Sequence, residues 1–140
     1  MAALEFGLML PVFLLLLAGL AEGAWLFQQA NAVEKGLRAG ALFLARSSDP
    51  FAAAAEAAAR NIVKTGNASG GGSYLAPGWA DMSATLSIEP GSFLVGEVNV
   101  PIVIMTARIP FKPLMPDLAA MFGLTGQTIQ LQHEQAYVGD

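Results

Sequence analysis

The chain has 140 residues, of which 54% are hydrophobic and only 13% are charged, and its formal net charge is −4. This length leaves room for one small domain with an appendage. Without a long basic run there is no electrostatic footprint for nucleic acid, so we expect no nucleic-acid partner. The lack of cysteine in the sequence excludes a disulfide framework, thiol catalysis and a cysteine-ligated metal.

The N-terminal part of the sequence is strongly apolar. Over residues 6–27 the single charged residue is Glu22, and a helix needs about 20 residues to cross the hydrocarbon of a bilayer. A signal peptide would have a shorter apolar stretch that follows a basic region. Here no basic residue precedes the run. The segment therefore predicts a membrane-spanning helix.

This helix is expected to continue from about residue 2 to residue 46, because good helix formers follow the apolar run until Ser47-Ser48-Asp49-Pro50 ends it. Its second half must then pack on other parts of the chain. Glycine costs a helix about 1 kcal/mol relative to alanine. We therefore interpret the glycines as sites of close helix packing, although a membrane helix can also simply tolerate them. The packing positions, with the proline that predicts a kink or local melting near residues 7–11, are Gly7, Pro11, Gly19, Gly23, Gly36 and Gly40.

The rest of the chain is expected to form a small head. Asp49 and Pro50 predict a second helix that Asp49 caps and Gly66 ends. Alternating apolar and polar residues predict strands at 82–89, 97–109 and 128–138, with a short helix at 117–122. Short connections favour an antiparallel sheet that covers the second helix and the exposed half of the first. The predicted fold class is α+β, with an N-terminal helix domain (residues 1–46) and a head domain (residues 47–140).

Catalytic chemistry is not indicated by the sequence. No set of titratable groups converges in the way that an active site requires, so we expect no enzymatic activity, no metal and no cofactor. The single histidine, His133, is next to Glu134 in a predicted strand, where the two side chains point to opposite faces. We interpret His133 as a polar residue at the rim of the sheet.

Two stretches of the sequence resemble one family. The segment AALEFGLMLPVFLLLLAGLAEGAWLF (residues 2–27) is similar to the N-terminus of the TadE-like pseudopilins of the tight-adherence (Tad or Flp) type IV pilus. That pattern is a run of small residues, Glu, Phe, and an apolar helix with a proline and a second glutamate. The segment IPFKPLMPDLAAMFGLTGQTIQLQHEQAYV (residues 109–138) is similar to the proline-punctuated ending and last strand of the family.

The resemblance implies a processing site and a set of partners. A prepilin peptidase would cut after a glycine and leave glutamate at mature position five before an aromatic residue, a register that Met1, Glu5 and Phe6 fit. Applied to the sequence as it stands, the positive-inside rule would place the C-terminal side of the helix in the cytoplasm. A basic leader that is later removed would instead allow the head to lie outside the cytoplasm. The implied localisation is the bacterial inner membrane with a periplasmic head, and then an extracellular pilus for surface adhesion. Partners would be copies of the chain or other pilins, together with the pilus assembly machinery. A membrane-retained assembly or scaffold protein that never enters the filament is the alternative.

Glu5 has a physical role of its own in this interpretation. A buried carboxylate without a partner costs several kcal/mol, so an acid at the apolar end of the helix predicts a nearby cation in the assembled state. The candidate is the free amine of Met1, and the resemblance implies the amine of a neighbouring subunit. Met1 and Glu5 would then fix the register between neighbouring subunits in the filament. The alternative is that Glu5 lies at the membrane surface, where a helix N-terminus stabilises it. Glu22 could snorkel, pair or sit near the far interface.

Overall fold

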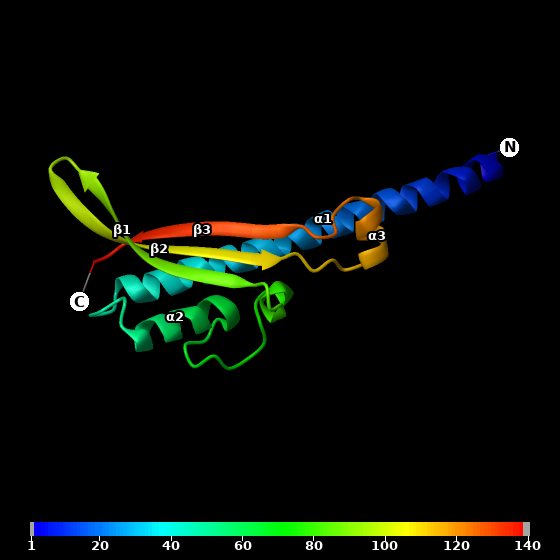
Figure 1. Cartoon of the computed structure of the whole chain (residues 1–140). Coiled ribbons are helices and arrows are strands. Elements are labelled where there is room, and N and C mark those ends of the chain that lie inside the picture. Colours follow the sequence, from blue (N-terminus) through cyan, green and yellow to red (C-terminus); the bar gives the residue numbers. More distant parts are fainter. Residues whose placement is uncertain (1, 139–140) are drawn as a thin grey trace.

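The computed structural model of the chain describes residues 2–138 and the side chains from Glu5 onward. Its elements are a long helix, a short helix, a 3-10 turn, two strands, a third helix and a last strand. In chain order these are α1 (Ala2–Ala45), α2 (Ala53–Thr65), η1 (Pro77–Ala80), β1 (Thr85–Val95), β2 (Val98–Pro110), α3 (Pro116–Met121) and β3 (Thr128–Ala136). The predicted α+β class is confirmed. Figure 1 shows α1 as a rod whose N-terminal part extends well beyond the other elements.

Helix α1 is continuous over 44 residues, which is about 66 Å at ~1.5 Å per residue. The prediction of one long helix from about residue 2 to residue 46 is confirmed. The helix runs through Pro11 without interruption, so the predicted local melting near residues 7–11 is wrong. Pro11 removes only the hydrogen bond to the carbonyl of Gly7, and a helix of this length keeps its other bonds on either side.

The three strands form one antiparallel sheet in the order β1-β2-β3. In the middle strand, Val103, Met105, Ala107 and Ile109 alternate with more exposed residues and are buried. Their cross-strand partners on β3 include His133, which lies opposite Met105. These buried residues belong to a core that also includes side chains of α1 and α2. The sheet thus covers the two helices, as the sequence predicted.

The second half of α1 supplies one wall of this core. Val33, Leu37, Ala41 and Leu44 are fully buried, and their spacing of three or four residues places them on one face of the helix. They pack with Ala59 and Val63 of α2. The division into residues 1–46 and 47–140 stays a prediction, and the core contains side chains from both sides of it.

Helix α2 begins three residues later than the sequence predicted. Ala52 occupies the N-cap position, and no side chain in the described part of the chain caps the helix. Asp49 is not the cap, because its carboxylate accepts the N–H of Phe51 at 3.1 Å and forms a turn before the helix. The predicted C-terminus is right. Gly66 has φ 76° and donates its N–H to Ile62, a left-handed conformation that glycine adopts without steric cost.

Strand β1 also begins three residues later than predicted, at Thr85. The Asp81 carboxylate accepts the N–H of Ser83 at 3.0 Å and its hydroxyl at 2.7 Å, which closes a turn where the strand was expected. Met82 is therefore fully exposed and does not face the core. The strand continues past Glu89 to Val95 and forms a long hairpin with β2.

The close packing of α2 on α1 depends on glycine. A Cβ atom at Gly36 would lie 2.5 Å from the carbonyl oxygen of Val63, and one at Gly40 would lie 3.1 Å from the carbonyl oxygen of Ala59. Gly36 is the more restrictive position, because backbone atoms surround it and cannot move aside as a flexible side chain can.

Replacing Gly36 with alanine is expected to lower the free energy of unfolding by about 1–3 kcal/mol, the usual cost of overpacking. The better helix propensity of alanine, worth about 1 kcal/mol, offsets only part of this cost. Gly23→Ala is the matched control, since a Cβ there would meet no atom within 4 Å among residues 2–138. Denaturant unfolding in detergent measures both variants. Equal stability of the two variants would contradict the packing role of Gly36.

Candidate membrane and assembly site

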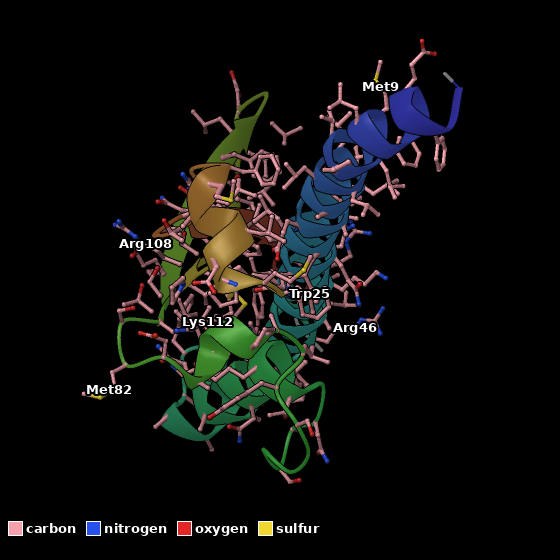
Figure 2. All side chains as sticks on the ribbon, turned by 90° about the vertical axis from the view of Figure 1, so that its right-hand side faces the viewer. Met9, Trp25, Arg46, Met82, Arg108 and Lys112 are labelled. Carbon is pink, nitrogen blue, oxygen red and sulfur yellow. The ribbon has the colours of Figure 1, made fainter. Side chains whose placement is uncertain are left out.

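The N-terminal part of α1 extends away from the head as an apolar stem, which we define as residues 5–21. Its large side chains are between 41% and 77% exposed and point in all directions around the helix. They are Phe6, Leu8, Met9, Leu10, Val12, Phe13, Leu14, Leu15, Leu16, Leu17 and Leu20. Figure 2 shows Met9 near the outer end of the helix, away from the head. An apolar surface of this extent in water marks a site for lipid or for another apolar surface.

Helix α1 meets the requirements of a membrane span by length and composition. From Glu5 onward it contains an 18-residue window with a mean hydropathy of 2.0, and only 6% of that window is buried inside the protein. The core helix of a water-soluble protein would be mostly buried. The low burial therefore leaves the stem available to a bilayer or to a helix of another subunit.

Glu5 and Phe6 are both exposed near the N-terminal end of α1. Glu5 lies in the first turn, where the helix N-terminus favours an acidic side chain. Met1 lies outside the described residues. The predicted pairing of Glu5 with the amine of Met1, and the processing register of Met1, Glu5 and Phe6, therefore stay predictions.

The predicted packing positions occupy different surroundings. Gly36 and Gly40 face α2 of the same chain, and a Cβ atom at Gly19 would lie 3.0 Å from the ring of Phe122. At Gly7 and Gly23 a Cβ would meet open space within the described chain. Pro11 is also exposed. Contacts of the exposed positions with other subunits stay predictions.

Glu22 has a role that the sequence did not reveal. Its side chain is fully buried, and its carboxylate accepts the backbone N–H of Leu114 at 3.1 Å and that of Met115. Both N–H groups belong to the irregular connector between β2 and α3, where no strand partner or helical turn satisfies them. A single carboxylate thus fixes the connector to the end of the stem.

Trp25 and Gln29 extend this contact along the same face of α1. The Gln29 amide donates to the carbonyl of Lys112 at 2.7 Å and accepts the Lys112 N–H at 3.3 Å. The Trp25 indole donates to the same carbonyl at 2.9 Å, and Figure 2 shows Trp25 and Lys112 in neighbouring positions between the helix and the connector. We call Glu22, Trp25 and Gln29 the polar clamp. Their spacing of three and four residues was visible in the sequence, but their partners lie more than 80 residues away.

The connector is also held from the side of the head. The Lys112 ammonium lies 2.6 Å from the Asp81 carboxylate. This hydrogen bond, together with those from Ser83, holds the pKa of the Asp81 carboxyl well below its usual range. Lys112 therefore links the polar clamp, through its backbone, to the turn before β1, through its side chain.

Most of α1 lies in a segment that matches a known protein family. Residues 1–42 match the family model of TadE-like proteins. The chain carries a TadE-like N-terminal segment. This match confirms the resemblance inferred for residues 2–27 and connects the chain with the pilin-like proteins associated with the Tad pilus. The similarity of residues 109–138 lies outside the matched range and stays a prediction. No curated protein and no solved structure matches the chain.

The polar clamp joins the TadE-like segment to the head, so its loss should destabilise the fold. In Glu22→Ala, the N–H groups of Leu114 and Met115 lose their acceptor, at about 1–3 kcal/mol each. Glu22→Gln keeps one acceptor oxygen, so its free energy of unfolding should fall less than that of Glu22→Ala. Glu34→Ala is the control, because the one interaction of its side chain within residues 2–138 is an exposed ion pair with Arg38, worth about 0.3–0.5 kcal/mol. Denaturant unfolding in detergent compares the three. A Glu22→Ala chain as stable as Glu34→Ala would contradict the clamp.

Proposed function

We propose that the chain is a structural, pilin-like subunit of a Tad-type pilus. After removal of a leader, the apolar stem of the TadE-like segment would anchor the chain in the inner membrane with its head in the periplasm. The same stem would then pack in the core of a filament that serves surface adhesion. The observation that carries this proposal is the apolar stem, which is apolar on every face and lies outside the core of the head. The family match of residues 1–42 supports the association with a pilus.

The energetics of the stem favour both environments over water. Full burial of one large apolar side chain is worth about 1.5–3 kcal/mol, and the stem exposes a whole series of them. A helix that is apolar all round suits lipid or the interior of a helix bundle equally well. Transfer from the membrane to a filament core would then cost little, and Glu5 would supply the specificity of assembly.

The proposed partners follow from this path. They are the inner membrane before assembly, copies of the chain or other pilins in the filament, the prepilin peptidase that removes the leader, and the assembly machinery. The exposed positions Gly7 and Pro11 of the stem, and Gly23 just beyond it, are the points at which a neighbouring helix can approach α1 most closely.

Cell fractionation tests this proposal. Washed membranes and sheared surface filaments are separated, the chain is quantified in each, and mass spectrometry determines its mature N-terminus. We expect the chain in both fractions, beginning at Met1. A chain found in membranes but missing from the filaments would favour the membrane-retained scaffold protein. A chain found mainly in the soluble fraction would contradict the anchor.

A further inference from the structure

An acidic residue lies at each end of the apolar run: Glu5 begins the stem and Glu22 follows it. Between Glu5 and Glu22 lie sixteen residues without a polar side chain. The distance along the helix from one acid to the other is about 26 Å at ~1.5 Å per residue, close to the ~30 Å of a bilayer hydrocarbon core. If α1 crosses the membrane, Glu5 therefore lies near one boundary of the hydrocarbon and Glu22 near the other.

The polar clamp places part of the head at the second boundary. Glu22 holds the connector immediately before α3, and the ring of Phe122, which follows α3, contacts Gly19. Gly19 is about 4.5 Å further along the helix toward Glu5. Figure 1 shows α3 beside α1, between the end of the sheet and the free N-terminal part of α1. Helix α3 thus lies level with the last turn of the stem.

The outer surface of this region is apolar. Leu114, Met121 and Phe122 are 58%, 70% and 44% exposed. Over residues 114–122 the single charged residue is Asp117, and the neighbouring ammonium of Lys112 is bound to Asp81. The region therefore offers little positive charge to anionic headgroups, and any attraction to a membrane has to come from its apolar side chains.

We propose that residues 114–122 form a foot that rests in the headgroup–acyl boundary of the bilayer that α1 crosses. Leu114, Met121 and Phe122 insert among the lipid chains, about 5–10 Å into the boundary, as interfacial helices do. Lipid is the occupant because the foot adjoins the exposed apolar stem at Gly19, against which the ring of Phe122 lies. This inference rests on the proposed membrane insertion of α1. It adds a second contact that fixes the height and tilt of the head.

The foot can be tested by depth-dependent quenching, since the chain has no cysteine of its own. Single variants Met121→Cys, Met82→Cys and Leu14→Cys are labelled with a fluorophore in the full chain and reconstituted into phosphatidylcholine vesicles. The vesicles contain lipids with a nitroxide either near the headgroup or deep in the acyl chain. Met82 is the matched control, because it is a fully exposed methionine of the head, and Figure 2 shows it on the far side from α1. Near-UV circular dichroism verifies that each labelled chain is folded.

We expect the Leu14→Cys label to be quenched most by the deep nitroxide, the Met121→Cys label most by the shallow nitroxide, and the Met82→Cys label by neither. If the Leu14→Cys label is quenched but the Met121→Cys label is no more quenched than the Met82→Cys label, residues 114–122 do not enter the bilayer. This result would overturn the foot but not the membrane anchor. Failure of both nitroxides to quench the Leu14→Cys label would show that α1 does not insert, and would overturn the anchor together with the foot.

Discussion

A chain that begins at Ser47 is expected to be unfolded, whereas a chain that begins at Ala18 is expected to fold and to stay dispersed without detergent. The Ser47 chain lacks the fully buried Val33, Leu37 and Leu44. Reduction of a single buried leucine to alanine costs about 2–5 kcal/mol. Loss of a whole core wall therefore exceeds the stability of a small domain, which is about 5–15 kcal/mol.

The Ala18 chain keeps the core, the polar clamp and the contact of Gly19 with Phe122. It lacks residues 1–17, of which residues 5–17 have exposed side chains. Far-UV circular dichroism and size-exclusion chromatography compare the two shortened chains with the full chain in detergent. A Ser47 chain that unfolds cooperatively at the same temperature as the Ala18 chain would show that the head folds without α1, contrary to the shared core.

Replacement of Glu5 should impair filament assembly far more than membrane insertion. Removal of the charge makes insertion of the stem easier. Assembly should become less favourable if Glu5 pairs with an N-terminal amine, because the substitution leaves that amine unpaired in an apolar filament core. Breaking a buried pair costs about 3–5 kcal/mol, which corresponds to a loss of incorporation of about 10²–10⁴-fold. The head should fold normally, since Glu5 lies in the first turn of α1, far from the core.

The matched comparison uses wild type, Glu5→Ala, Glu5→Gln and Glu22→Ala. The abundance of each is measured in membranes and in sheared filaments. Glu22→Ala is expected to lower the abundance in both fractions, because it destabilises the junction of stem and head. The Glu5 variants should lower only the abundance in filaments. Equal incorporation of Glu5→Ala and wild type would remove the registration role and leave Glu5 as an acid at the membrane surface.

Much of the architecture could be predicted because it depends on local patterns. The prediction that the second half of α1 packs on the rest of the chain is an example, since the helical spacing of the buried Val33, Leu37, Ala41 and Leu44 is visible in the sequence. The C-terminus of α2 at Gly66 depends on one residue that adopts a left-handed conformation without strain. The antiparallel sheet followed from alternating segments and the short connections expected between them.

The errors and omissions arise from side chains that bond to unexpected backbone groups. Asp49 and Asp81 each form a tight turn, so α2 and β1 both start later than their patterns suggested. The clamp of Glu22 could not be predicted, because its partners at Leu114 and Met115 are separated from it by more than 90 residues. An acid in an apolar helix reveals only that a partner is needed, and the folded chain is required to identify it.

In the proposed filament, the apolar stem is buried among the stems of neighbouring subunits. Sheared surface filaments that carry Leu14→Cys or Met82→Cys can be treated with a water-soluble maleimide before and after dissociation in detergent. We predict that the Leu14→Cys site reacts only after dissociation, while the Met82→Cys site on the exposed turn of the head reacts in intact filaments. Rapid reaction of the Leu14→Cys site in intact filaments, or filaments that lack the chain altogether, would contradict a filament role for the stem.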